Sequence, residues 1–260
     1  MKEESQALPK LLALTVLICS CVFAWGAITG PVDVAQNGAS TSVFTLPITN
    51  NAATDSIGIV NFGVHDSTDA DRVVVTVTWG LSAMTAAGYL DNLGDNKSGG
   101  QYYLVNPPTG SNDVVITFAG TVSGVAASAT TWEGVDQASP LNAVSFKTNS
   151  TATVVSISAT SSVDSVLFID QYTKYLVTGT VTPAGDQTVL GNAAVGAAYW
   201  QATTYNNAGL AAGAKTFTYT NSLTSGTITI MGAYAPTVAA AGSTNYGYPF
   251  TDLRLMGVGQ

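Results

Sequence analysis

The stretch Tyr102-Tyr-Leu-Val-Asn-Pro-Pro-Thr-Gly-Ser-Asn-Asp-Val-Val-Ile-Thr-Phe118 joins two runs of aromatic and β-branched residues through the turn at 106–110. Proline fixes φ for the first corner of a turn, and glycine accepts the positive φ that closes it. Aromatic and β-branched side chains fit a pleated, half-buried surface, so both runs are predicted to be strands. The stretch therefore predicts a β-hairpin with a loop of several residues.

Short strands of the same kind recur along the rest of the chain, with no amphipathic helix between them. Val73, Val75, Val77 and Trp79 are expected to share a buried face, and Ile228 and Ile230 to face inward between outward threonines. This pattern predicts an all-β fold, a two-sheet antiparallel sandwich of a jelly-roll-like type. Strands are predicted at 43–49, 57–65, 72–79, 101–105, 113–120, 126–133, 142–147, 153–159, 165–172, 175–181, 196–204, 214–220 and 226–234.

Composition excludes several classes of function. Only 9% of the 260 residues are charged, against about a quarter in typical proteins, and the formal net charge is −8. No cluster of Lys or Arg offers the basic face that nucleic acid requires. Cys19 and Cys21 are the only cysteines, which excludes thiol redox chemistry, zinc–thiolate sites and disulfides from the rest of the chain. Low charge with abundant small and hydroxyl residues is typical of extracellular surface proteins.

The N-terminus is predicted to be an export or anchoring signal. Residues 11–28 carry no charge and would form a hydrophobic helix of about 27 Å, close to the thickness of a bilayer core. A cleaved signal peptide, a retained membrane anchor and lipidation of Cys21 all remain open. The predicted organisation is a signal or anchor over 1–30, an extension with the first strand over 31–56, a sandwich over 57–236 and a C-terminal extension over 237–260.

Four stretches, over 73–85, 102–110, 114–118 and 134–141, follow one another in an order that resembles a known β-sandwich module. The module recurs in secreted and surface proteins of bacteria and archaea and in some phage structural proteins. The likeness covers roughly residues 57–235, and the turns Pro-Pro-Thr-Gly and Gly-Val-Asp-Gln are its most specific parts. It implies a jelly-roll-like sandwich displayed outside the cell, and it carries over no catalytic residue.

Candidate catalytic groups are few. His65 lies beside Asp66, but the chain has no Gly-x-Ser-x-Gly nucleophile elbow. Glu133 with Asp136, and Asp164 with Asp170, are the nearest approach to a glycosidase carboxylate pair. The first pair is expected to accept hydrogen bonds from turn amides instead. We therefore expect no enzymatic activity.

Acidic loops suggest calcium as the one candidate cofactor. Three carboxylates, on Asp66, Asp69 and Asp71, fall between two predicted strands, and Asp91 and Asp95 follow the next strand. Calcium takes six to eight oxygen ligands, which such loops at one end of a sandwich can supply. The alternative is a pair of solvated turns.

Aromatic residues suggest a second candidate site, for glycans. Tyr199, Trp200 and Tyr205 flank the loop 206–209 and are the best candidates for an exposed stacking platform. Trp79 falls on the apolar face of its strand and is expected to lie in the core.

The C-terminal extension carries a further apolar segment after a small-residue linker. Leu253 and Leu255 alternate with charged neighbours, the period of a strand with one buried face. This strand could complete its own sandwich, remain a loose tail, or pair with a neighbouring copy whose pockets receive Phe250, Leu253 and Leu255. The predicted function is a non-enzymatic extracellular structural or adhesive protein, a subunit of a surface filament, layer or virion that assembles with copies of itself. A secreted glycan-binding module is the rival hypothesis.

Overall fold

The computed structural model describes residues 27–237 except 33, 54, 93–95, 150, 176–178, 196–198 and 209–210. The predicted N-terminal helix, up to Gly26, and the C-terminal residues Phe250, Leu253 and Leu255 lie outside the described residues. Every strand pairing in the described part of the chain is antiparallel. Within it, no helix is long and apolar enough to cross a membrane. The elements are β1 (Val34–Asn50), β2 (Ser56–His65), the 3-10 helix η1 (Asp69–Arg72), β3 (Val74–Trp79), β4 (Ser82–Ala83), β5 (Thr85–Asn92), β6 (Lys97–Val105), β7 (Gly110–Glu133), β8 (Leu141–Asn149), β9 (Val154–Ser161), β10 (Leu167–Tyr175), β11 (Val181–Pro183), β12 (Thr188–Val195), β13 (Tyr199–Asn206), β14 (Gly213–Asn221) and β15 (Thr227–Tyr234).

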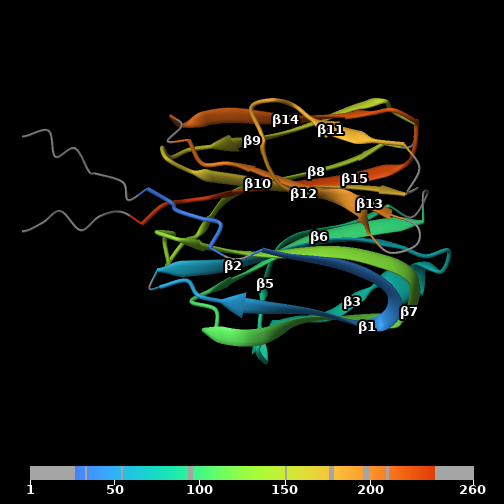
Figure 1. The fold of residues 1–260 in the computed structure, drawn as a ribbon, viewed down its shortest axis with the longest axis horizontal. Coiled ribbons are helices and arrows are strands. Elements are labelled where there is room, and N and C mark those ends of the chain that lie inside the picture. The colour runs from blue at the N-terminus through green and yellow to red at the C-terminus, as the bar shows by residue number, and fades with distance from the viewer. Residues whose placement is uncertain are drawn as a thin grey trace, which may run out of the picture.

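The all-β, antiparallel sandwich class is confirmed, but the described strands form three sheets and not two. A seven-stranded sheet has the order β4-β3-β7-β2-β6-β5 with β1 also paired to β7; a five-stranded sheet has the order β12-β13-β10-β15-β8; a three-stranded sheet has the order β11-β14-β9. Figure 1 shows these sheets stacked as four layers, because the seven-stranded sheet folds over and supplies two of them. We call β1–β7 the N-terminal sandwich and β8–β15 the C-terminal sandwich.

Two long strands allow the seven-stranded sheet to bend over into two layers. The 24-residue β7 pairs with β3 along its first part and with β2 along its last part, while the 17-residue β1 follows it on the other side. Both strands curve at the right-hand end of Figure 1. Register shifts on both sides of Thr41 place β-bulges in β1 near this bend, and bulges let a strand turn sharply. The enclosed core includes Phe44, Phe62, Trp79 and Phe118.

The predicted hairpin is wrong, although its turn is present. The chain does turn between β6 and β7, with positive φ at Asn106 (48°) and Gly110 (82°). However, β2 lies between β6 and β7 in the sheet, and the first part of β7 belongs to the other layer of the sandwich. Turn residues determine where the chain reverses. They do not determine which strand pairs with which.

The predicted buried face of β3 is also only half right. Val77 and Trp79 are buried as expected, but Val73 is 48% exposed and Val75 is 60% exposed. The pairing of β3 with β7 shifts register between Val74 and Thr76. A bulge adds one residue on one strand, so the alternation changes phase there and Val74 packs on the core instead.

The C-terminal sandwich has a core of its own between the five-stranded and three-stranded sheets. Its side chains include Phe168, Tyr172, Phe217, Tyr219 and Met231. The rings of Tyr172 and Tyr219 stack with centroids 4.6 Å apart. This core shares no residue with that of the N-terminal sandwich, so each sandwich buries its own apolar faces.

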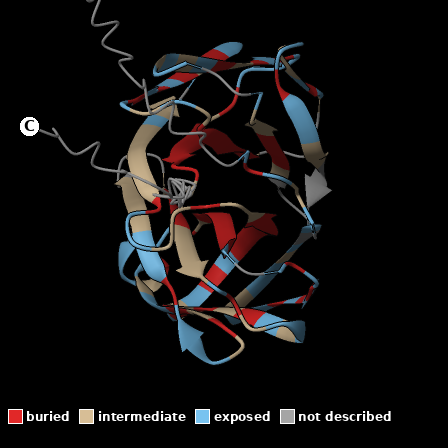
Figure 2. Cartoon of the chain, turned by 90° about the vertical axis from the view of Figure 1, so that its left-hand side faces the viewer, coloured by how far each residue is buried: buried red, intermediate tan, exposed pale blue. Residues whose placement is uncertain are grey.

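The two sandwiches pack against each other through a face that is apolar at one end and polar in the middle. Trp132 and Tyr234 belong to the apolar end, together with isoleucine and leucine side chains of β2 and β10. In the polar middle, Gln101 Nε2 donates to Asn61 Oδ1 (2.7 Å) and Tyr234 OH donates to Gln101 Oε1 (3.0 Å). Thr203 Oγ1 donates to Ser128 Oγ across the same face (2.9 Å). Figure 2 shows the buried strands in the middle of the molecule and the exposed segments on its outer layers.

The prediction that Thr227 and Thr229 face outward is therefore wrong. All eight residues of β15 are buried, because its strand lies in an inner layer with the N-terminal sandwich on one face and the C-terminal core on the other. Strands buried on both faces lose the simple alternation of polar and apolar residues.

Close approach of the two sandwiches predicts that Gly63→Ala destabilises the protein. An added Cβ at Gly63 would lie 2.5–2.7 Å from Oγ1, Cγ2 and Cβ of Thr173, and rotation of the threonine cannot move its own Cβ. We expect a loss of about 1–3 kcal/mol in urea unfolding. Gly185→Ala is the control, since nothing lies within 4 Å of its added Cβ. A Thr173→Gly change should lessen the effect of Gly63→Ala, and equal costs with and without it would contradict the contact.

Candidate functional site

The loop predicted to hold calcium is organised around the buried side chain of Arg72. This loop, with η1, carries the chain from β2 in one layer to β3 in the other. The guanidinium is fully buried and donates to the Asp66 carbonyl, to the Asp69 carboxylate and to Asp91 Oδ1 (3.2 Å). A planar guanidinium with several donors can hold three acceptors at once. Arg72 therefore fixes the corner between the two layers.

The Asp66 carboxylate ties this corner to the bend of β7. It accepts from Thr68 N (2.7 Å), Ser123 N (2.7 Å) and Ser123 Oγ (2.6 Å). Burial acts to raise the pKa of Asp66, but these hydrogen bonds outweigh it and lower the pKa below its ordinary value. The carboxylate is thus held ionised where β7 turns between layers.

The other predicted calcium ligands do not all meet. The positive charge that Asp69 and Asp91 face is the Arg72 guanidinium. Asp71 packs against Gly120, and Asp95 lies outside the described residues. Among residues that the structure describes, no group of three or more His, Cys, Asp or Glu side chains is placed to share a metal ion. Calcium stays a prediction.

His65 and Asp66 each contact a different element of the fold. The His65 ring stacks on Tyr175 with centroids 4.1 Å apart and 14° between planes, at the end of the interface between the sandwiches. Burial, followed by the charge of Lys97, lowers the pKa of His65. The Asp66 carboxylate accepts hydrogen bonds from Ser123 and Thr68.

The carboxylates considered as a glycosidase pair instead accept hydrogen bonds from backbone amides of loops, as predicted for Glu133 and Asp136. Glu133 Oε1 accepts from Ala53 N (2.6 Å), and Asp136 Oδ1 accepts from Ala138 N (2.8 Å) and Ser139 N (3.2 Å). This part of the prediction is confirmed. In the second pair, Asp164 accepts from Ala212 N (2.6 Å) near the surface, whereas Asp170 is fully buried.

Asp170 is the most perturbed acid in the described residues, and its role was not predicted. Its Oδ1 accepts from Thr204 Oγ1 (2.7 Å) and from Tyr219 OH inside the C-terminal core, and Gln187 Nε2 donates to the same threonine (3.0 Å). Burial raises the pKa of Asp170 to about 7, although the hydrogen bonds from Tyr219 and Thr204 act to lower it. Its place in a run of β-branched and aromatic residues was the only sequence signal of burial.

The aromatic residues predicted to bind glycan do not form one platform. Trp200 is half-buried, and its Nε1 donates to Asn192 Oδ1 (2.5 Å) on the face of β13 toward the C-terminal core. Tyr205 lies on the opposite face, edge-on to Trp132 with centroids 4.8 Å apart. Their odd separation of five residues already implies opposite faces of a strand. The side chain of Tyr199 is not among those described, and glycan binding stays a prediction.

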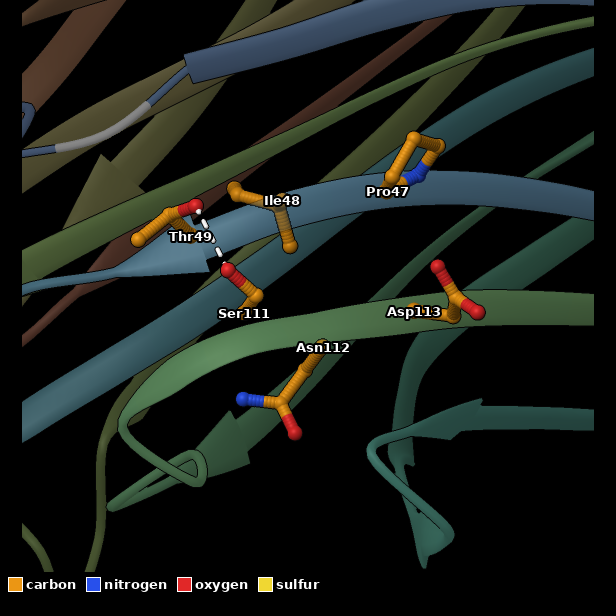
Figure 3. Close-up of a pocket in the computed structure, with 6 residues that line it drawn as sticks. All are labelled: Pro47, Ile48, Thr49, Ser111, Asn112 and Asp113. Carbon is orange, nitrogen blue, oxygen red and sulfur yellow. Dashed lines mark hydrogen bonds between the residues drawn. The ribbon is translucent and has the colours of Figure 1, made fainter.

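Two surface hollows flank the turn between β6 and β7, and sequence reasoning missed both. Figure 3 shows the first, of about 260 Å³, between the end of β1 and the start of β7, where Thr49 Oγ1 and Ser111 Oγ lie 3.3 Å apart. Pro47, Ile48, Asn112 and Asp113 complete its lining. The second, of about 520 Å³, is mostly apolar and is lined by Ala52, Ala53, Ser56, Asn106, Pro107, Pro108 and Thr109. The Pro-Pro turn was the signal, since it places two rigid apolar rings side by side.

Comparisons with protein-family models, with curated proteins and with solved structures give no match for this chain. A functional proposal therefore rests on the residues and their geometry.

Removal of Arg72 is expected to destabilise the corner strongly. Arg72→Ala leaves the Asp66 carbonyl and two carboxylates without their buried partner, so we expect a loss of about 3–5 kcal/mol in urea unfolding. Lys215→Ala is the control, because its ion pair with Asp186 (2.6 Å) is more open to solvent and should cost at most about 1 kcal/mol. Similar losses for both variants would show that Arg72 does not hold the fold.

The buried carboxyl of Asp170 predicts that stability falls as pH rises. Below about pH 4 the group is protonated in both states; from there to its folded pKa of about 7, only the unfolded state loses the proton. Stability from this group is therefore full at low pH and is lost as pH approaches 7, by a few kcal/mol. Asp170→Asn stays neutral and should flatten this slope in denaturation series from pH 4 to 8. Asp164→Asn is the control, and an unchanged slope in Asp170→Asn would refute the raised pKa.

Proposed function

We propose that the chain is a non-enzymatic structural or adhesive protein that acts outside the cell. It would be a subunit of a filament, layer or virion built from copies of itself. Any attachment to a membrane would come from residues 11–28. The low share of charged residues and the confinement of cysteine to positions 19 and 21 support an extracellular role.

The observation that carries this proposal is the free edge of β1. In the described part of the chain, β1 pairs with β7 alone, and none of its 17 residues is charged. Long edge strands present unpaired N–H and C=O groups to other chains, and monomeric proteins commonly block them with lysine or other charges. Only local features limit this edge: Thr41 Oγ1 bonds to the N–H and C=O of Val43, and Pro47 has no N–H.

The outer faces of the stack support the same role. On the three-stranded sheet, the outward side chains form cross-strand hydroxyl pairs, Ser156 with Thr218 (2.9 Å) and Ser158 with Thr216 (2.7 Å). On the opposite outer layer, the outward side chains of β1 and β7 also carry almost no charge, and Asp113 is the only charged residue among those described. Faces that carry almost no charge do not repel copies of themselves.

The jelly-roll-like arrangement belongs to this proposal. Its support is that the C-terminal sandwich has eight strands in two sheets and that most of its consecutive strands alternate between them.

A charge on the free edge is expected to block assembly. Thr45 is exposed on β1, so Thr45→Lys should leave folding unchanged and shift the full chain from polymers to monomers in light scattering and negative-stain microscopy. Thr220→Lys is the matched control, since Thr220 is also exposed but its strand is paired on both sides there. A wild-type chain that stays monomeric would refute self-assembly, and equal effects of both variants would refute the role of the edge.

A further inference from the structure

The apolar hollow beside the β6–β7 turn has rigid walls. Asn50 Nδ2 donates to the carbonyls of Pro107 (2.8 Å) and Pro108 (3.0 Å), while its Oδ1 accepts from Ala52 N (3.0 Å). On the other side, Asn106 N donates to Ser56 O (2.8 Å). Asn50 is buried, so one side chain holds both walls of the hollow in place. A preformed hollow of about 520 Å³ has the size of a binding pocket and costs little to organise on binding.

The described chain leaves the fold close to this hollow. Thr237 N donates to Gly134 O (2.7 Å). Glu133, which precedes Gly134, accepts through its side chain from Ala53 N (2.6 Å) in the wall of the hollow. Val135 is bridged to Pro236 on one side and donates to Asp55 O (3.0 Å) on the other. The exit of the C-terminal segment and the wall of the hollow are thus held to the same short piece of chain.

The segment that follows has the chemistry to fill the hollow. Residues 246–250, Tyr-Gly-Tyr-Pro-Phe, carry three aromatic rings and a proline and no charge, and the lining of the hollow is also uncharged. Flat aromatic rings pack well on proline rings, the pairing by which proline-rich segments are recognised. The nine residues from 238 to 246 can span up to about 30 Å, more than enough to reach a neighbouring wall.

We propose that residues 246–250 dock in the hollow of their own chain, against Pro107 and Pro108. The tether decides between the own chain and a second copy, because a short linker gives the segment an effective concentration in the millimolar range at its own hollow. This contact is independent of the β1 edge and seals an apolar hollow at one end of the N-terminal sandwich.

Disulfide trapping in the full chain tests this docking. Cys19 and Cys21 are first changed to Ser, and Ala53→Cys in the exposed wall is combined with Phe250→Cys. We expect an intramolecular disulfide, seen by peptide mapping, that forms at least about tenfold faster than in the control pair Ser67→Cys with Phe250→Cys. Ser67 is exposed and follows the far end of β2, about 30 Å away. Thr109→Cys, on the opposite wall, repeats the test without touching Ala53.

Two further measurements make each outcome decisive. Tyr248→Ser added to the trapped pair should slow disulfide formation, because it removes one of the three rings. Mixing chains that carry Ala53→Cys alone with chains that carry Phe250→Cys alone should give little linked dimer. Equal rates for the near and far pairs, or a disulfide that forms only between chains, would overturn docking in the own chain. Neither result bears on whether Thr45→Lys blocks assembly.

Discussion

The whole structure depends on burying two sheet faces that carry polar side chains against each other. Hydrogen bonds offset part of the cost of this burial: Tyr234 bonds to Gln101 and Thr203 bonds to Ser128 across the interface, and Gln101 also bonds to Asn61 within the N-terminal sandwich. Removing one partner of such a buried pair would cost about 1–3 kcal/mol. Because hydrogen bonds require a fixed geometry, the polar middle of this interface also fixes how one sandwich lies on the other, which an apolar contact alone would do less sharply.

The N-terminal sandwich meets a second constraint, the bend of one sheet into two layers. The long strands β1 and β7 turn the corner continuously and pair with each other. On the other side of β7 the corresponding path is interrupted, because the chain passes from β2 to β3 through η1. Arg72 and Asp66 stand at this interruption and tie β2, β5 and the bend of β7 together. The acidic loops that suggested a calcium site thus face a positive charge from within the chain. Carboxylates that surround a buried guanidinium stabilise the fold. The amino-acid composition of a loop does not distinguish this structural role from metal binding.

Charge is distributed in a way that links the fold to the proposed role. Among the described residues, most acidic side chains lie in the loops between strands, whereas the outer faces and the free edge of β1 are almost uncharged. The apolar hollow lies at one of these ends, beside the exit of the C-terminal segment. The contacts proposed for the faces, for the edge and for the end of the molecule would thus use different residues, although Asn50 at the end of β1 also holds the walls of the hollow.

The sequence by itself determined the local features: the all-β class, the burial of Val77 and Trp79, the turn at 106–110, and the use of Asp136 to hold turn amides. Each follows from neighbours along the chain, through side-chain alternation, proline geometry or short-range hydrogen bonds. Tertiary structure alone decided that 113–120 and 126–133 are parts of one strand, that β2 separates β6 from β7, that β15 is buried on both faces, and that Asp170 lies in a core. Strand partners and layer positions depend on contacts between residues far apart in sequence, and a pattern of period two carries no information about them.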